Sequence, residues 1–374
     1  MNGCLINIFK DIPDPRRGNG IRHRLDEILI IAILSVLCDC SKFTEMELFG
    51  LEREEWLRTF LSLENGIPSH DTFGDVFAAL SPEAIQERFI SWVETIREKI
   101  SGDIVPIDGK TIRRSKDLAN GKRAIHIISA WSAANGIVLG QIAVDEKSNE
   151  ITAIPDLLKM LELKGCIVTI DAMGTQTEIA GTIIDGGADY VLAVKENQPS
   201  LFEDIELFFS TESATCDFFK TTEKSHGRYE TRECWATMDI GWLHNKEKWA
   251  GFSGIGMIRS KRQQVGIESV ESSTKYFIFS GDMSASGLLA ANRAHWGIEN
   301  SLHWVLDMDF REDESRMRLG NCATNMNVLR HLALNLIKSE TSTKLSVNMR
   351  RKRCMLSLDY LLEVIGVSSE NPVR

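Results

Sequence analysis

Hydrophobic positions recur at helical spacing through the first part of the chain. An unbroken apolar run from Ile28 to Leu34 predicts a buried helix, and apolar residues three and four apart predict an amphipathic helix from Glu45 to Leu63. Two more helices begin at capping signals, one at Ser69 and one at Ser81, which precedes a proline at the first helical position. We therefore expect a helical domain over residues 1–100.

At residue 104 the pattern changes to short apolar strands that alternate with helices. The predicted elements are strands at 104–108, 124–132 and 137–144, a helix at 150–161, a strand at 166–171, a helix at 175–184 and a strand at 190–194. Asn135 and Gly136 separate the second and third strands, and this dipeptide is typical of a tight hairpin. The fold class is therefore α/β, and the order β-β-β-α-β-α-β is that of the ribonuclease-H-like fold.

Residues 200–285 interrupt this alternation. Short strands, scattered glycines and three tryptophans, Trp235, Trp242 and Trp249, predict a β-rich insertion. Helical spacing then returns at 287–306 and 321–338, with a short helix near 360–365. We expect three parts in all: the leading helical domain, an α/β domain at 101–340 that contains the insertion, and a basic tail at 341–374.

Two of the buried strands end in an aspartate. Asp108 follows the apolar run 104–107, and Asp171 follows the run 167–170. An ionised carboxylate in such a place is costly unless it is paired or bound to a cation. One such aspartate is as readily a helix cap or a turn residue, but two in the same context predict a divalent-metal site.

A third carboxylate is needed to hold two metal ions about 4 Å apart, and Glu299 on the helix after the insertion is our candidate. Its rivals lie in an acid-rich run more typical of a surface or of salt bridges: Asp307, Asp309, Glu312 and Asp313. His295, Glu299 and His303 recur every four residues on one helix face, which a zinc site would also require. The hard oxygens of the aspartates favour Mg²⁺ or Mn²⁺ instead.

The overall charge argues against nucleic-acid binding, because 53 acidic and 43 basic residues give a formal net charge of −10. Three local clusters are nevertheless strongly basic. They comprise Arg16, Arg17, Arg22, His23 and Arg24; Arg113, Arg114, Lys116, Lys122 and Arg123; and Lys344, Arg350, Arg351, Lys352 and Arg353. Each cluster taken alone is compatible with a solvated face, so the charge pattern leaves DNA binding open.

The cysteines and the apolar runs indicate the cellular compartment in which the protein is expected to work. The eight cysteines contain no C-x-x-C pair, which argues against structural zinc and favours a reducing cytosolic compartment. The first 18 residues lack the apolar core of a signal peptide. The longest apolar run, from Ile28 to Cys38, is shorter than the roughly 20 residues that span a bilayer.

Several longer motifs resemble those of insertion-sequence transposases with a DDE catalytic domain, and more narrowly the H-repeat-associated group found beside Rhs elements in bacteria. The matching stretches are Gly66–Thr72, Val105–Thr111, Asp145–Ile151, Thr169–Gly174, Lys195–Gln198, His295–Asp307 and Arg330–Asn335. The resemblance covers nearly the whole chain. It implies a ribonuclease-H-like catalytic domain with a β insertion ahead of the glutamate.

The resemblance also implies a chemistry. Asp108, Asp171 and Glu299 become a catalytic triad that holds two Mg²⁺ ions, with Mn²⁺ as a substitute, for phosphoryl transfer on DNA. The expected partner is double-stranded DNA carrying the terminal repeats of the element, bound by a homodimer in the synaptic complex. The expected location is the bacterial cytoplasm, at the nucleoid when the protein is bound to DNA.

We expect basic residues of these clusters, of the insertion and of the cleft to contact DNA phosphates. The candidates are Lys110, Arg113, Arg114, Lys195, His226, Arg228, His295, Arg350, Arg351 and Lys352. One insertion tryptophan is expected to reach the cleft and stack on an unpaired base, unless all three belong to the core of the insertion.

The sequence departs from many relatives around the glutamate. Where they carry a tyrosine, an arginine and a lysine, this chain has Asn292, His295 and Leu306. The role of gripping phosphate then falls to other side chains, with Arg293, His295 and Arg311 as candidates. Two alternatives to a transposase stay open: a ribonuclease-H-like nuclease without strand transfer, and a catalytically silent DNA-binding descendant.

Overall fold

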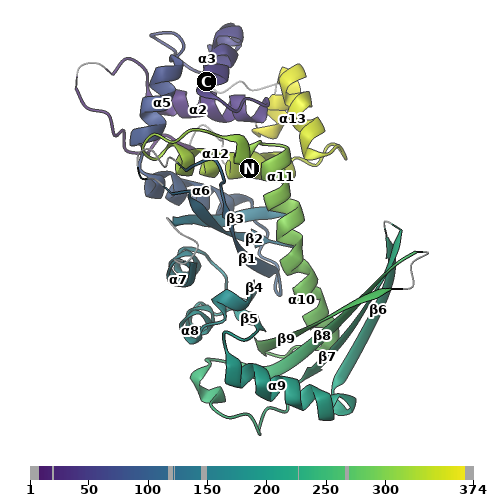
Figure 1. Ribbon diagram of the computed structural model, residues 1–374. Helices are drawn as coiled ribbons and strands as arrows, with labels where there is room; N and C mark the ends of the chain where they lie inside the picture. The colour runs from purple at the N-terminus through teal and green to yellow at the C-terminus, as the bar shows by residue number, and fades with distance from the viewer. Residues whose placement is uncertain are drawn as a thin grey trace.

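One mixed sheet of nine strands runs through the molecule, with helices gathered at one end of it and along its sides (Figure 1). The computed structural model describes residues 8–18, 21–116, 121, 123–144, 150–225, 227–265 and 269–366. The motif at 145–151 therefore lies outside the described residues except for Glu150 and Ile151. None of the described helices combines the length and apolar composition that a membrane span requires.

The leading part is helical, as predicted. Its described helices are α2 (Leu25–Leu37), α3 (Phe43–Glu52), α4 (Glu54–Leu57), α5 (His70–Ala79) and α6 (Pro82–Ile96). The hydroxyls of Ser69 and Ser81 accept hydrogen bonds from the first turns of α5 and α6, which confirms both capping signals.

The single helix predicted from Glu45 to Leu63 is wrong, because the chain breaks after α3 and turns before Leu63. The buried carboxylate of Glu27 accepts hydrogen bonds from the backbone N–H groups of Ser62 and Leu63, at 2.9 and 3.0 Å. Leu63 has a φ of 44°, a left-handed conformation that a helix does not contain. The turn lets Leu61 and Leu63 bury themselves beside α2.

The first five strands follow the predicted order. They and the helices between them are β1 (Ile104–Thr111), β2 (His126–Ser132), β3 (Ile137–Val144), α7 (Glu150–Met160), β4 (Ile167–Ile170), α8 (Thr177–Asp185) and β5 (Asp189–Val194). A turn at Ala133–Gly136 joins β2 to β3 in the predicted hairpin. Strands β1, β4 and β5 are parallel, whereas β2 and β3 are antiparallel to their neighbours.

Asp108 does not end its strand, contrary to the prediction. Strand β1 continues to Thr111 by pairing with β2, but its pairing with β4 stops at Ile107, opposite Ile170. Asp108 and Asp171 therefore both stand at the point where the β1–β4 ladder ends. The two aspartates predicted to form one metal site thus occupy one corner of the sheet, although β1 continues past Asp108.

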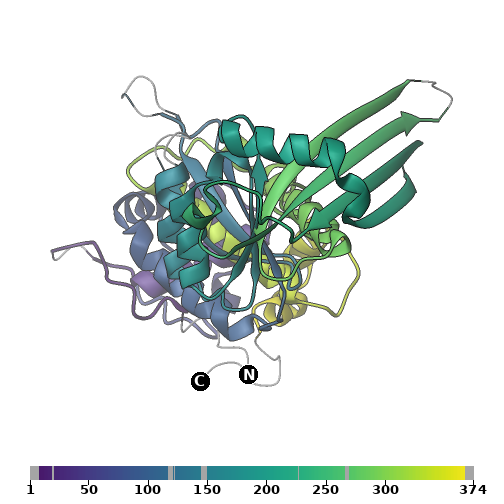
Figure 2. The same cartoon turned by 90° about the horizontal axis from the view of Figure 1, so that it is seen from below.

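The segment at 200–285 is not a set of short strands. It begins with a helix, α9 (Pro199–Thr211), and continues as four long strands. These are β6 (Asp217–Ser225), β7 (Arg228–Thr237), β8 (Phe252–Gln264) and β9 (Val270–Ser280). Strand β9 pairs with β5, so the full strand order is β3-β2-β1-β4-β5-β9-β8-β7-β6. The insertion thus extends the main sheet and reaches beyond the body of the molecule (Figure 2).

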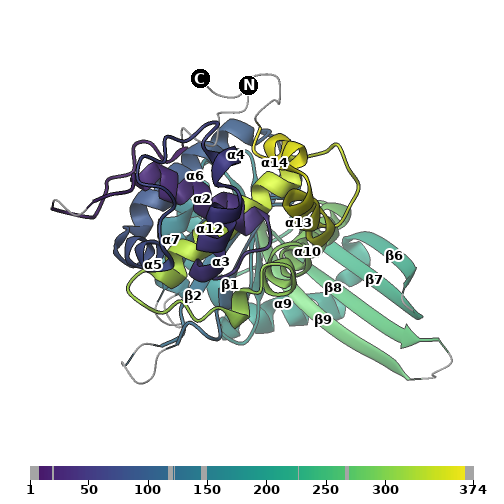
Figure 3. The ribbon, with the colours of Figure 1, turned by 90° about the horizontal axis from the view of Figure 1, so that it is seen from above.

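The chain after the insertion is again helical. It comprises α10 (Ala285–Ile298), a π-helical turn (Glu299–His303), α11 (Trp304–Met308), α12 (Cys322–Ser339), α13 (Val347–Leu356) and α14 (Leu358–Val364). The predicted helices at 287–306, 321–338 and 360–365 are therefore present, with α13 as an addition. Helix α12 packs against α2, α5 and α6 of the leading part and against α13, and α2 lies over it in the view from above (Figure 3).

Helix α12 ties the leading helices to the sheet through buried amides. The Asn325 amide donates to the carbonyl oxygens of Phe77 and Leu80 at the end of α5. The Asn335 amide both accepts from and donates to the backbone of Val138 on the outer edge of β3, at 2.8 Å each. Asn335 thereby takes the place of a neighbouring strand, which protects this free edge of the sheet.

A buried ion cluster joins β1 to the segment that follows Glu299. The Lys110 ammonium lies 2.9 Å from a carboxylate oxygen of Glu312 and also pairs with Asp307. The other oxygen of Glu312 accepts from the Asn327 amide at 2.9 Å and lies 3.6 Å from Arg330. Burial alone would raise the pKa of Glu312, but Lys110, Arg330 and their neighbours lower it to about 2. Glu312 is therefore ionised at neutral pH.

We predict that Glu312→Gln lowers the free energy of unfolding by about 3–5 kcal/mol, because it removes the carboxylate from buried Lys110 and Arg330. Urea denaturation at pH 7, followed by circular dichroism, measures the change. Glu314→Gln is the matched control. Glu314 is exposed two residues along the chain, so its variant should stay within about 0.5 kcal/mol of the parent.

The same variant should also flatten the acid limb of the stability curve. The pKa of Glu312 is lower in the folded protein than its ordinary value of 4.5. Its contribution is therefore complete above pH 4.5 and is lost as the pH falls towards 2. The parent should lose stability over this window more steeply than Glu312→Gln, and parallel curves would mean that the cluster contributes no net stability.

Candidate active site

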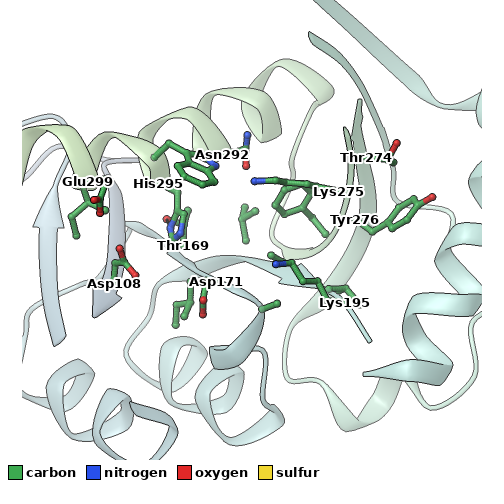
Figure 4. Close-up of a pocket in the computed structure, with 18 of the residues that line it drawn as sticks. Asp108, Thr169, Asp171, Lys195, Thr274, Lys275, Tyr276, Asn292, His295 and Glu299 are labelled. Carbon is green, nitrogen blue, oxygen red and sulfur yellow. Dashed lines mark hydrogen bonds between the residues drawn. The ribbon is translucent and has the colours of Figure 1, made fainter. Parts of the chain in front are cut away.

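A cavity of about 410 Å³ opens at the corner of the sheet where the β1–β4 ladder ends, and α10 covers one side of it. Asp108, Asp171 and Glu299 all line it, from β1, from the turn after β4 and from the end of α10 (Figure 4). The structure therefore brings the three predicted carboxylates into one cavity. Their catalytic role stays a prediction.

Asp108 is held by its own strand and by the residues beneath it. Its carboxylate accepts a hydrogen bond from the N–H of Gly109 at 2.9 Å. Gly109 packs directly against the buried side chains of His126 and Glu150, which contact each other, and a Cβ at this position would collide with both. The glycine after Asp108 is therefore required by close packing under the strand.

Asp171 caps the short 3₁₀ turn Ala172–Gly174. Its carboxylate accepts from the N–H groups of Met173 and Gly174, at 3.1 and 3.4 Å. The turn is held from the far side, because the Asn197 amide donates to the carbonyl of Ala172 at 2.6 Å and the Gln198 amide donates to that of Thr175 at 2.9 Å. In the motif at 195–198, Lys195 lines the cavity, whereas Asn197 and Gln198 support the turn that carries Asp171.

Glu299 begins the π-helical turn between α10 and α11. Its carboxylate lies 3.0 Å from Nδ1 of His303, and the same nitrogen lies 3.6 Å from the carboxylate of Asp108. His295 lies elsewhere in the cavity, with Nδ1 3.1 Å from the hydroxyl of Thr169. The predicted stripe of His295, Glu299 and His303 is thus divided between two environments.

The electrostatics of the cavity favour a bound cation. Burial raises the pKa of Asp108, and the nearby Asp171 adds to that rise, although His303 and His295 oppose it. Burial lowers the pKa of His295, which leaves its imidazole with less positive charge to offset the carboxylates. Oxygen donors from three carboxylates are the ligands that Mg²⁺ and Mn²⁺ prefer, so the residues present fit such an ion.

The rival carboxylates are used for structure. Asp307 and Glu312 pair with Lys110, and Asp313 pairs with Arg113. Burial raises the pKa of Asp309, and Arg351 opposes that rise. None of the four is among the residues that line the cavity in the described part of the chain.

Three of the predicted DNA contacts make interactions inside the protein, and their role in DNA binding stays a prediction. Lys110 belongs to the buried ion cluster. The Arg350 guanidinium donates to carbonyl oxygens at the end of α12 and beyond, including those of Ile337 and Glu340. Buried Arg351 donates to the carbonyl of Val36 and pairs with Asp39. The basic tail thus packs its arginines against α2 and α12.

The other predicted contacts have varied surroundings. Lys195 and His295 line the cavity, and His226 lies outside the described residues. Lys195 is exposed, and so are Arg113, Arg114, Arg228 and Lys352, which lie outside the cavity. Of the alternative phosphate ligands, Arg293 pairs with Glu223, and Arg311 lines a different hollow beside α3.

No insertion tryptophan lines the described cavity. Trp235 packs against Phe218 with ring centroids 5.1 Å apart, and Trp242 stacks on Phe208 at 5.0 Å. Trp249 is buried, with 8% of its surface exposed. The alternative, in which all three rings belong to the core of the insertion, agrees with the burial of Trp249, whereas Trp235 is half-buried and Trp242 is exposed.

Two cavity residues escaped the sequence analysis. Trp296, on α10, is 55% exposed, and the Lys275 ammonium of β9 lies 4.4 Å from the centre of its ring. Burial lowers the pKa of Lys275, and the charge of Lys195 lowers it further. Lys275 reaches the cavity only because β9 pairs with β5, which local sequence patterns do not specify. Trp296 directly follows His295, but a tryptophan on a predicted helix is usually buried. Only its exposure in the folded protein marks it as a cavity residue.

Comparison with known proteins identifies related sequences over the whole chain. The family model described as "Transposase DDE domain" matches residues 100–336, and the model described as "DDE_Tnp_1-associated" matches residues 6–93. "Putative transposase YncI" of Escherichia coli O157:H7 is 41% identical over 98% of this chain and 95% of its own length. "H repeat-associated putative transposase YhhI" of Escherichia coli K12 is 36% identical over 97% and 98%.

The exposures of the tryptophans lead to a stability test. Trp296→Ala should leave the free energy of unfolding within about 0.5 kcal/mol of the parent, because its ring is largely exposed. Trp249→Ala should cost about 3–5 kcal/mol, because it removes a buried ring. Urea denaturation of the two variants makes the comparison. A large loss for Trp296→Ala would show that its ring is packed in the folded protein.

Proposed function

The chain belongs to the family of transposases with a DDE domain, and from this premise we propose that it cuts and joins DNA strands at the ends of a bacterial insertion sequence. Asp108, Asp171 and Glu299 are the proposed catalytic carboxylates. The single observation that carries this assignment is their convergence on one cavity from three separate elements.

The arrangement of the first five strands supports a ribonuclease-H-like core. The order β3-β2-β1-β4-β5, with β1, β4 and β5 parallel and a β2–β3 hairpin at the edge, agrees with the element order from which that fold was predicted. In this proposal β6–β9 are an insertion into the core that continues its sheet.

We propose two Mg²⁺ ions, or Mn²⁺ in their place, held by Asp108, Asp171 and Glu299. Bound in this way, the ions would make a water or a DNA 3′-hydroxyl more acidic and neutralise the leaving oxygen. The protein supplies the positions. Asp108 stands on a strand packed over His126 and Glu150, Asp171 on a clamped turn, and Glu299 on a helix fixed to the sheet.

Around the carboxylates, other residues of the cavity suit a DNA strand. Lys195, Lys275 and His295 place basic groups where phosphates would lie, and Trp296 offers an exposed ring on which an unpaired base could stack. Arg113, Arg114, Arg228 and Lys352 are proposed as further phosphate contacts outside the cavity. The proposed substrate is duplex DNA bearing terminal repeats, brought together by two copies of the chain.

The alternatives from the sequence are less well supported. A silent DNA-binding descendant has no need to keep three carboxylates in one cavity. A nuclease without strand transfer would share the cavity, but the transposase relatives span almost the full chain. Incubating the protein with pre-cut element ends and a circular target distinguishes the two, because only a transposase joins them.

We predict that Asp108→Ala, Asp171→Ala and Glu299→Ala each reduce Mg²⁺-dependent cleavage of element ends at least ~100-fold, equivalent to ~2.7 kcal/mol of transition-state stabilisation. Glu314→Ala, at an exposed acid outside the cavity, is the control and should cleave normally. Thermal melting of each variant verifies folding. A well-folded variant that cleaves at the parental rate would remove its residue from the triad.

Lys275 and Trp296 should affect DNA binding in different ways. Lys275→Ala should reduce the slope of log affinity against log salt by about one, because one phosphate is no longer neutralised. Trp296→Ala should weaken binding by up to ~3 kcal/mol with the slope unchanged, because stacking releases no counterions. Binding titrations between low and moderate salt test both. Lys159→Ala, on the exposed face of α7, is the control and should keep the parental slope. If both variants gave the same slope, Lys275 would make no specific contact with a phosphate.

A further inference from the structure

The carboxylates of Asp108 and Glu299 both lie close to one nitrogen atom, Nδ1 of His303. Nδ1 of His303 and one oxygen from each carboxylate all lie within 4.8 Å of one another. Among the described residues, this is the group of carboxylate and imidazole atoms with the spacing of a metal site, and it does not include Asp171. The third partner of Asp108 and Glu299 is therefore an imidazole.

The local backbone explains how His303 reaches this position. Residues Glu299–His303 form a π-helical turn between two α-helical segments. Such wide turns inside helices are rare and occur frequently at functional sites. The turn brings Nδ1 of His303 within 3.6 Å of both Asp108 and Glu299, which line the cavity, although His303 itself is not among the lining residues.

His303 is also poorly accounted for as a packing residue. Its side chain is 4% exposed, and Nε2 has no hydrogen-bond partner in the described protein. Leaving a buried polar atom unsatisfied costs stability, and buried groups of this kind call for a functional explanation. The other ring nitrogen, Nδ1, is the one that both carboxylates approach, at 3.0 Å for Glu299 and 3.6 Å for Asp108.

We infer that His303 is a direct ligand, through Nδ1, of a divalent metal ion that it shares with Asp108 and Glu299. This inference rests on the proposed function, because it concerns one of the metal ions of the same cavity. Imidazole nitrogen binds transition metals more readily than it binds Mg²⁺, which prefers oxygen ligands. The site therefore prefers Mn²⁺ to Mg²⁺, and His303 sets that preference.

Electron spin echo spectroscopy of the full-length protein with Mn²⁺, in the absence of DNA, tests the inference directly. The parent should show coupling of the Mn²⁺ electron spin to a histidine ¹⁴N nucleus. His295→Gln should retain this coupling, because His295 lies against Thr169. His303→Ala should lose it and bind Mn²⁺ at least ~10-fold more weakly, since even an indirect partner of a ligand contributes 10–100-fold.

His303→Asp is the matched variant that keeps a ligand but replaces nitrogen by oxygen. It should still bind metal, and its ratio of Mn²⁺ to Mg²⁺ affinity, measured by competition, should fall at least ~10-fold relative to the parent. Thermal melting with and without Mn²⁺ verifies that each variant is folded. A fallen ratio in a folded protein separates a metal ligand from a residue that only positions Glu299.

Three outcomes would overturn the inference: no nitrogen coupling in the Mn²⁺-saturated parent, coupling that persists in His303→Ala, or an unchanged metal ratio in His303→Asp. All readouts are independent of DNA cleavage. Failure of strand cleavage with nitrogen coupling present would overturn the proposed function and leave the metal ligand in place. Normal cleavage without nitrogen coupling would support the proposed function and overturn the assignment of His303 as a metal ligand.

Discussion

The buried pair of Lys110 and Glu312 joins two parts of the chain that are 202 positions apart. Lys110 follows Asp108 by two residues on β1, and its other partner, Asp307, follows Glu299 by eight on the same run of helix. The distance between the carboxylates of Asp108 and Glu299 therefore depends on this ion cluster. Asn327 and Arg330 extend the connection to α12, so the same contacts link the cavity to the leading helices.

Each carboxylate of the cavity is supported by groups that do not line it. Gly109 lets β1 lie close upon the His126–Glu150 pair, and Asn197 with Gln198 clamps the turn after Asp171. This division of labour explains why the recurring motifs are longer than three residues. A ligand held within a few tenths of an ångström requires neighbours that fix its backbone and its rotamer.

The negative net charge argued against DNA as a partner of a chain that belongs to a transposase family. The local basic clusters indicated DNA binding, but not all of their side chains are available for it. The tail looked like a phosphate-binding segment, but Arg350 and Arg351 satisfy backbone carbonyls and a carboxylate inside the protein. A guanidinium has five donors in a fixed fork, which suits the exposed carbonyls at helix ends as well as it suits phosphate. The lysines that do line the cavity, Lys195 and Lys275, come from isolated positions, the first directly after β5 and the second on β9.

The sequence by itself determined much of the local structure, but not the turn at Leu63, which the distant Glu27 holds. Capping at Ser69 and Ser81, the hairpin at Asn135–Gly136 and the runs before Asp108 and Asp171 depend on neighbours a few residues away, so their periodicity and turn chemistry could be read directly. Only the tertiary structure decided the pairing of β5 with β9, and with it the entry of Lys275 into the cavity. It also placed His303 beside Asp108. These contacts join residues far apart in the chain, and their free energy comes from burial and pairing with a partner that no local pattern identifies.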